Sequence, residues 1–389
     1  MPTKPSIKKL KVVGNKKPRR VLICPNAFKG SLSAAGAARA MASGVRRRGG
    51  KAVTLPFADG GDGTLDVLQR PLRLSVRRSR AMDPVGRPIS ARWGYNPKTR
   101  WAVVEMAHAS GLALLKSGEC RPMETTSYGT GQLIRAAVRA GAKVIFLGLG
   151  GSATVDGGLG LLQALGAKIT VRKAGKTEPL GTPATGGDLA FLHGIDARPV
   201  LQTLRKVRLR VLCDVRNPLL GVRGAARAFG PQKGASPSDV LRLERGLKRL
   251  SVLIRSLGRD VSRMPGTGAA GGAAAGLSGF ASARLERGAE TIFRLLRLEQ
   301  HVQQADLVMT GEGRVDRTSW EGKSLGELNR LCRRYDKPLI VLAGGIGSGG
   351  RRRGVRVVPI GGTQRSLDER MRKAKTFLRK AVIDVLRFA

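Results

Sequence analysis

Short apolar runs alternate with helix-like segments at both ends of this chain. RVLIC (20–24) is followed by a loop, by a helix-like segment that Ser33 begins, and by the run AVTLPF (52–57). Near the other end, DLVMT (306–310) precedes the helical GELNRLCRRY, the runs PLIVLAGG and VRVVPI, and a last helix with a capping box at Ser366. Because parallel strands need crossover helices between them, this alternation predicts a parallel sheet with helices on both faces.

The middle of the chain has a different texture. WAVVEM (101–106), KVIFLGLGG (143–151) and LRVLCD are typical of strands, but long glycine-punctuated connections separate them. One helix is well marked, because Ser236 begins it and Gly258 ends it. Its apolar stripe repeats with helical spacing and consists of Val240, Leu243, Leu247, Leu250, Ile254 and Leu257.

The length of 389 residues suggests two or three domains at about 150 residues each. The two regions of strand and helix alternation lie far apart in the sequence, which predicts a discontinuous domain with a second α/β domain inserted into it. The predicted segments are a basic disordered tail at 1–19, the discontinuous domain at 20–80 and 290–389, and the inserted domain at 81–289.

The net charge of +44 first suggests a nucleic-acid partner. The first 20 residues hold eight basic and no acidic residues, so most of the excess lies elsewhere along the chain. It is diffuse, and it lacks zinc-finger spacing and a platform of interleaved aromatic residues. Two interpretations stay open: a solvated arginine-rich surface, or a surface that associates with polyanions or nucleic acid without sequence selectivity.

Cysteine usage and the N-terminus predict a cytoplasmic protein. The four cysteines are far apart and form no CxxC pair, which favours a reducing compartment. The basic start lacks the apolar core of a signal peptide. Residues 264–283 carry no charge, but six of them are glycine, so we expect a buried, close-packed segment and no membrane partner.

Five glycine-rich loops directly follow predicted strands, where open α/β sheets bind ligands. They are ADGGDGT (58–64), TTSYGTG (125–131), GLGGSATVDGG (148–158), CDVRNP (213–218) and TGEGRVD (310–316). Glycine lets backbone N–H groups approach phosphate oxygens, and neighbouring hydroxyls and acids can bind hydroxyl groups or Mg²⁺. Together the loops favour a polar site that handles phosphate. No Walker A loop, GxGxxG fingerprint or GxSxG elbow accounts for them.

If the site transfers a phosphoryl group, as the family resemblance given in the next paragraph implies, it requires a phosphate cradle, a metal ion, a base and a cation on the transferred group. Lys29 is the expected cation, Asp214 and Glu312 are the expected metal ligands, and Asp156 or Asp316 is the expected general base. The sequence does not decide between the two bases, and the alternative for each acid is a helix cap. The expected substrate- and phosphate-binding residues are Asp59, Asp62, Thr125, Thr126, Ser127, Gly150, Gly151, Ser152, Thr154 and Asn217.

Eight motifs in order closely resemble the bacterial glycerate kinase family. They are PNAFKGSLSA, PFADGGDGT, EMAHASGL, TTSYGTGQLI, GLGGSATVDGGLGLLQALGA, CDVRNPLLGVRGAARAFGPQKGA, PGTGAAGGAAAG and TGEGRVDRTSWEGK. The resemblance implies Mg²⁺- and ATP-dependent phosphorylation of D-glycerate, and leans towards the 2-hydroxyl as acceptor. It also implies a Rossmann-like or flavodoxin-like parallel-sheet domain, interrupted by a second mixed-sheet α/β domain, with the site in the cleft between them.

The chain departs from the family pattern at four loop positions, one of which is the absence of the usual Pro after the GK pair in GKSLGEL. The family commonly has Asp where Asn26 stands, Glu where Asp62 stands and Gln where Thr318 stands. These differences concern substrate preference and turnover more than the fold. The alternative function is a kinase-derived fold repurposed as a basic nucleic-acid or ribonucleoprotein-binding protein.

Overall fold

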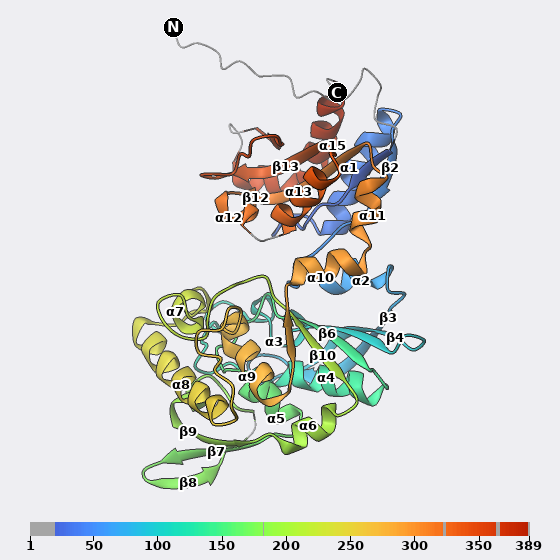
Figure 1. The fold of residues 1–389 in the computed structure, drawn as a ribbon. Coiled ribbons are helices and arrows are strands. Elements are labelled where there is room, and N and C mark those ends of the chain that lie inside the picture. Colours follow the sequence, from blue (N-terminus) through green and yellow to red (C-terminus); the bar gives the residue numbers. More distant parts are fainter. Residues whose placement is uncertain (1–19, 182, 322–323, 363–365, 388–389) are drawn as a thin grey trace. The chain divides into compact units, whose positions relative to one another are not determined.

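The structure is a computed structural model of the chain, and it divides into two compact units (Figure 1). Unit 1 comprises residues 1–58 and 293–389, and unit 2 comprises residues 59–292. Residues 59–80, assigned above to the discontinuous domain, lie in unit 2 because β3 pairs with β4 in the sheet of that unit. The predicted tail at 1–19 lies outside the described residues, which are 20–181, 183–321, 324–362 and 366–387.

Unit 1 contains a five-stranded, fully parallel sheet in the order β14-β13-β12-β1-β2. Its strands are β1 (Arg20–Ile23), β2 (Lys51–Thr54), β12 (Leu307–Val315), β13 (Leu339–Ile346) and β14 (Arg356–Pro359). Its helices are α1 (Ala34–Arg47), α11 (Leu298–Gln303), α12 (Arg317–Trp320), α13 (Ser324–Arg334), α14 (Leu367–Arg372) and α15 (Ala374–Val385). The boundary between the units falls within α10 (Gly288–Leu295).

The core of unit 1 forms where α1 and α15 pack against the sheet. Met41 and Val45 of α1 and Leu378 and Val382 of α15 are fully buried together with apolar residues of β1, β12 and β13. Gly44 brings the two helices close, since a Cβ there would lie 2.8 Å from the side chain of Val382. The apolar runs of β1, β12 and β13 are therefore buried strands of a parallel sheet, whereas the edge strands β2 and β14 are only partly buried.

Unit 2 contains a six-stranded mixed sheet in the order β11-β10-β6-β5-β4-β3 and a three-stranded antiparallel sheet in the order β8-β7-β9. Its strands are β3 (Ser75–Met82), β4 (Pro88–Asn96), β5 (Trp101–Glu105), β6 (Val144–Gly148), β7 (Lys168–Lys173), β8 (Lys176–Pro179), β9 (Leu192–Asp196), β10 (Arg208–Leu212) and β11 (Arg284–Glu286). Its α-helices are α2 (Thr64–Gln69), α3 (Ala107–Ser110), α4 (Tyr128–Arg139), α5 (Leu159–Ala164), α6 (Arg198–Leu204), α7 (Ala225–Phe229), α8 (Pro237–Arg255) and α9 (Ala273–Phe280). Four short 3₁₀ helices are η1 (Leu112–Leu114), η2 (Gly187–Phe191), η3 (Pro231–Lys233) and η4 (Ala269–Gly272). The predicted fold class, a parallel-sheet α/β domain with a second mixed-sheet α/β domain, is confirmed.

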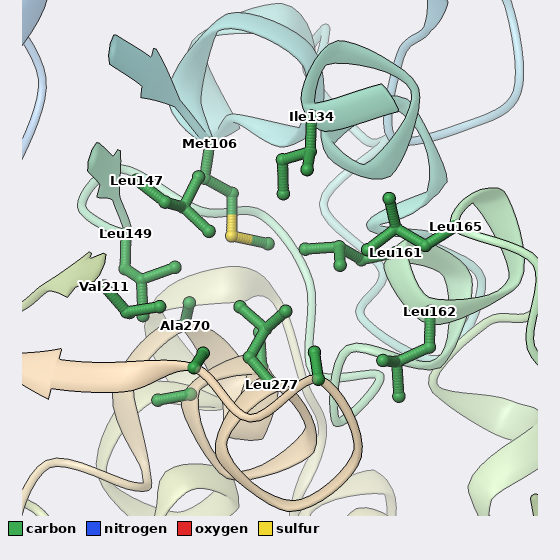
Figure 2. Packing of buried hydrophobic residues seen from close by; sticks show 14 of the residues in the cluster. Met106, Ile134, Leu147, Leu149, Leu161, Leu162, Leu165, Val211, Ala270 and Leu277 are labelled. Atoms are coloured by element: carbon green, nitrogen blue, oxygen red, sulfur yellow. The ribbon is translucent and has the colours of Figure 1, made fainter. Parts of the chain in front are cut away.

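A continuous apolar core fills unit 2. Figure 2 shows side chains from α4, α5, α9 and the central strands meeting around Met106, Leu147 and Leu277. The uncharged segment 264–283 contributes η4 and α9, and its residues from 267 onward are almost all buried, as the sequence predicted. Within the described ranges, no helix combines the length and the apolar character that crossing a membrane would need.

Two of the predicted helix starts are confirmed by their caps. The Ser33 side chain accepts a hydrogen bond from the Gly36 N–H, and Ser236 forms a reciprocal capping box with Asp239 at the start of α8. The predicted stripe of α8 is wrong at its last position. Leu257 is 56% exposed because α8 ends at Arg255, so the following residues leave the buried face.

Candidate active site

The glycine-rich loops of unit 2 meet at one edge of its sheet. Strands β5, β6, β10 and β11 are parallel, so their carboxyl ends lie along the same edge. The loops that begin there are 106–111, 149–158, 213–218 and 287–289. This is the position where open α/β sheets bind ligands.

The loop 58–63 packs against two of these loops. A Cβ on Gly150 would lie 2.3 Å from the Cα of Gly61, and a Cβ on Gly288 would lie 2.1 Å from the carbonyl oxygen of Asp59. Only glycine fits at such approaches. Three segments that are far apart in the sequence are therefore in direct contact at this edge.

Glu105, at the end of β5, holds the loop 59–63 in place. The N-cap of α2 is Gly63, which offers no side chain to the helix start. The buried side chain of Glu105 serves as the cap instead. One of its carboxylate oxygens accepts from the Gly63 N–H at 3.1 Å and the other accepts from the Leu65 N–H. Burial raises the pKa of Glu105 to about 7 despite these hydrogen bonds. Glu105 is not among the site residues predicted from the sequence.

Asp62, Glu105 and His108 form a cluster with the spacing of a metal site. One ligand atom of each lies within 4.8 Å of the others. However, His108 Nε2 already accepts a hydrogen bond from Arg92 at 3.1 Å, and Arg92 also pairs with Asp66 at 2.9 Å. Because His108 Nε2 and both oxygens of Glu105 are engaged by hydrogen-bond donors, the cluster does not suit Mg²⁺, which prefers oxygen ligands.

Asp214 and Asp59 offer a better-suited pair of oxygen ligands. Both oxygens of Asp214 accept from the Ala289 N–H, at 3.1 and 3.2 Å, and one oxygen of Asp59 accepts from the Gly61 N–H at 3.1 Å. Burial, and to a smaller extent the negative charge of Asp59, raises the pKa of Asp214 to about 7. A divalent cation with oxygen ligands would relieve this repulsion.

In the loop 148–158, two glycines reach the protein surface, whereas the hydroxyl groups are buried. Gly151 is exposed, with a left-handed φ of 74°, and Gly150 is partly exposed. Ser152 and Thr154 are buried, and the Ser152 hydroxyl accepts a hydrogen bond from Lys233 Nζ at 2.8 Å. The Thr154 hydroxyl is buried without a hydrogen-bond partner in the described part of the chain. The Gly150 N–H donates to the Gly60 carbonyl oxygen at 3.3 Å, so the exposed backbone of Gly151 is the part of the predicted cradle within reach of solvent.

Lys233 is a buried lysine that packs against this loop. It is not among the site residues predicted from the sequence. Its Nζ donates to the Ser152 hydroxyl and to the Thr154 carbonyl oxygen, both at 2.8 Å. Burial lowers the pKa of Lys233 to about 7, and nearby Asp156 acts in the opposite direction. The motif GPQKGA contains this lysine, but nothing in the local sequence marks a lysine as buried.

Asp156 has the contacts of a capping residue. It is fully buried, and its carboxylate accepts from the Ser127 N–H at 2.8 Å, the Ser127 hydroxyl at 2.6 Å, the Gly158 N–H at 3.1 Å and the Gly160 N–H at 3.3 Å. Burial raises the pKa of Asp156, and these donors oppose the shift. The carboxylate therefore locks the start of α5 to the loop that precedes α4.

The second predicted cradle and Asn217 make internal contacts. Thr125 and Thr126 are buried, and their hydroxyls bond to the Ala153 carbonyl oxygen and the Tyr128 N–H. The Asn217 side chain donates to the carbonyl oxygen of residue 223 at 2.8 Å and so shapes the loop after β10. These side chains order the loops at the sheet edge.

The remaining predicted residues lie in unit 1, near the carboxyl end of its parallel sheet. Glu312 lies within β12, and Lys29 is exposed in a turn between β1 and α1. Asp316 is the N-cap of α12 and accepts from the N–H groups of Thr318 at 2.9 Å and Ser319 at 3.3 Å. The structure therefore brings the predicted residues together in two groups, one in each unit.

Comparison with known proteins assigns this architecture to one family. The model of the glycerate kinase family matches residues 21–389. The chain belongs to the glycerate kinase family. Glycerate 2-kinase of Escherichia coli is 40% identical over 330 residues, covering 84% of this chain and 85% of that protein. A glycerate kinase of Halalkalibacterium halodurans is 39% identical over 332 residues, covering 85% and 86%.

A solved structure has the same fold as this family member. A crystal structure from Salmonella typhimurium LT2, provisionally named glycerate kinase 2, superposes with a TM-score of 0.80 at 38% identity. The match covers 95% of this chain and 97% of the other. The predicted family and the predicted enzyme class, a kinase, are thereby confirmed. The comparisons give no support to the alternative of a repurposed nucleic-acid-binding protein.

Proposed function

We propose that this family member transfers the terminal phosphoryl group of ATP to the 2-hydroxyl of D-glycerate, giving 2-phosphoglycerate and ADP, with Mg²⁺ as cofactor. The observation that carries the proposal is the convergence of glycine loops and carboxylates at the carboxyl edge of the unit 2 sheet. Support for the acceptor position comes from the name of the 40%-identical Escherichia coli relative, glycerate 2-kinase.

Phosphoryl transfer is catalysed by positioning and by positive charge on the phosphates. The exposed backbone of Gly151 is our candidate for a phosphate contact, whereas the Gly150 N–H donates to the Gly60 carbonyl oxygen and helps to hold the loop. Lys29 is our candidate for the cation on the transferred group, since it is exposed in a short loop after the first strand. Lys233 holds the cradle from beneath through Ser152.

Asp214 and Asp59 are our proposed ligands for Mg²⁺. Their oxygen atoms match its ligand preference, and a cation would offset both the burial of the Asp214 carboxylate and its repulsion by Asp59. When bound, Mg²⁺ would neutralise negative charge on the phosphates. Glu312, the other ligand predicted from the sequence, lies in unit 1 and remains a proposal.

Asp62 is our preferred general base. It is an exposed carboxylate on the loop that Glu105 fixes, whereas the oxygens of Asp156 are buried and engaged by four donors. Asp316 accepts hydrogen bonds at a helix start, which supports the capping alternative for it. A base must reach the acceptor hydroxyl, and Asp62 has the most accessible carboxylate of the three.

The direct test measures ADP release with ATP and D-glycerate, with and without Mg²⁺. We expect a glycerate-dependent rate well above hydrolysis without acceptor, and ³¹P NMR should identify 2-phosphoglycerate as the product. Absence of glycerate-dependent ADP at millimolar substrate would contradict the proposal. Formation of 3-phosphoglycerate would keep the kinase activity and overturn the acceptor position.

The base is tested with three matched variants, Asp62→Asn, Asp156→Asn and Asp316→Asn. Loss of a general base lowers kcat by about 10²- to 10⁴-fold, whereas loss of a cap costs about 0.5–2 kcal/mol of stability. We expect Asp62→Asn to lower kcat at an unchanged melting temperature, and Asp156→Asn to lower the melting temperature. The opposite pattern would transfer the catalytic role to Asp156.

A further inference from the structure

A groove lined by arginines lies in unit 2, formed by β3, its partner β4, and α4. Its volume is about 540 Å³, which is within the usual range for small-molecule sites. Of its lining residues, only Tyr128 belongs to a loop of the candidate active site, the loop 125–131. We call it the arginine groove, and its basic lining residues are Arg77, Arg78, Arg80, Arg135 and Arg139.

Three of these arginines, Arg77, Arg135 and Arg139, share the side of the groove between β3 and α4, whereas Arg78 and Arg80 alternate with Arg77 along β3 and belong to the other face of the strand. Arg135 and Arg139 are four residues apart on α4 and therefore project from the same helix face. The α4 face is tied to the strand because the Met82 N–H donates to Gln132 at 2.8 Å. Arg77 is held over the rings of Trp93 and Tyr95, with centroid distances of 5.7 and 4.6 Å. At least one guanidinium of the groove is thus fixed before any ligand binds.

The arginine groove contains positive charge without internal compensation. None of its lining residues is acidic, and none of its five arginines forms an ion pair among the residues that the structure describes. Neighbouring arginines on the same hairpin behave differently: Arg92 pairs with Asp66 at 2.9 Å, and Arg87 pairs with Asp83 and Glu119. The groove therefore gathers those guanidinium groups of the hairpin that lack a carboxylate.

We propose that the arginine groove is a second ligand site of this protein and that it binds an oligophosphate chain. Guanidinium groups bind phosphate oxygens in pairs of parallel hydrogen bonds, so several arginines facing one cavity favour several linked phosphates over a single carboxylate. Either an inorganic oligophosphate or the phosphate chain of a nucleotide provides this chemistry.

The groove offers little aromatic surface for stacking bases, since Tyr128 is the partly exposed one of its two aromatic lining residues, Trp93 and Tyr128. Single-stranded nucleic-acid sites add aromatic rings on which bases stack. Trp93 is only 3% exposed, and Arg77 lies over its ring, so this ring is not free to receive a base. Recognition at the groove consequently depends on phosphate groups.

The experiment is calorimetric titration of the full chain with sodium tripolyphosphate at about 0.15 M salt, where diffuse surface charge is largely screened. The groove variant is Arg135→Gln with Arg139→Gln. Glutamine and arginine have similar helix propensities, and both side chains are exposed on α4, so we expect the helix to be kept. The matched control is Arg245→Gln with Arg249→Gln, an equally spaced, exposed pair on α8. Circular dichroism checks that both variants are folded.

We expect the groove variant to weaken one tripolyphosphate site about tenfold or more, since two charge-assisted contacts are lost, while the control changes affinity by less than about twofold. Titrations with ATP and AMP then distinguish the source: equal groove-dependent affinity for ATP and tripolyphosphate indicates the phosphate chain of a nucleotide, and weaker ATP binding indicates a free oligophosphate. Equal losses in both double variants, or no loss in the groove variant, would overturn the proposal. Groove-dependent binding of an oligonucleotide without groove-dependent binding of tripolyphosphate would also overturn it.

Discussion

Replacing Lys233 with methionine tests how the glycine-rich loop 148–158 is supported. Methionine has a similar length and retains the apolar contacts of the buried lysine, but it removes the ammonium that donates to Ser152 and Thr154. The change leaves one buried hydroxyl and one carbonyl oxygen without this donor. Such losses cost about 1–3 kcal/mol each, while removal of a buried charge acts in the opposite direction.

The pH dependence of the free energy of unfolding separates the effect of the buried ammonium from these two opposing contributions. Burial lowers the pKa of Lys233 from 10.5 to about 7, so between these values the unfolded chain binds more protons than the folded one. The contribution of Lys233 to the free energy of unfolding is therefore present above pH 10.5 and is lost as the pH falls through about 7. Because one pKa unit corresponds to about 1.4 kcal/mol, raising the pH from 7.5 to 9.0 should stabilise the wild type by about 2 kcal/mol relative to Lys233→Met.

The assay is urea unfolding at the two pH values, followed by tryptophan fluorescence in a Trp320→Phe background. The remaining tryptophans, Trp93 and Trp101, both lie in unit 2, so the signal reports the unit that contains Lys233. The matched control is Lys248→Met, which removes an exposed lysine from α8. We expect the control to follow the wild type. If the difference between Lys233→Met and the wild type is the same at both pH values, the ammonium is not a buried charge and the reasoning is wrong.

Three further predictions concern the sheet edge of unit 2. Burial raises the pKa of Glu105 from 4.5 to about 7, so its contribution to stability is present below pH 4.5 and is lost as the pH rises through 7. Thermal unfolding should therefore show that the wild type loses stability relative to Glu105→Gln across this pH range. Gly288→Ala should destabilise the protein by about 1–3 kcal/mol, because the new Cβ would meet the Asp59 carbonyl oxygen, whereas Gly181→Ala, in open space, should not. Asp214→Asn should raise the Mg²⁺ concentration needed for half-maximal glycerate phosphorylation, and an unchanged requirement would exclude it as a ligand.

The sequence by itself determined the fold class and the places where the loops lie. Alternating strand and helix signals require crossover connections, and these build a parallel sheet whose loops collect at one edge. The helix starts at Ser33 and Ser236 were also predictable, since a cap bonds to a backbone N–H about three residues away. The strand β3 was missed because its arginine-rich sequence SVRRSRAM lacks the apolar pattern of a buried strand.

Only the tertiary structure decided what the individual side chains do. Lys233 reaches Ser152 across 81 residues, and Glu105 caps a helix that begins about 40 residues earlier. Asp156, predicted as a base, is instead surrounded by donors that include Ser127, 29 residues away. Local hydrogen bonds leave a trace in the sequence because chain geometry fixes their spacing. Contacts between distant segments leave none, since they depend on which loops the packed sheet brings to the same edge.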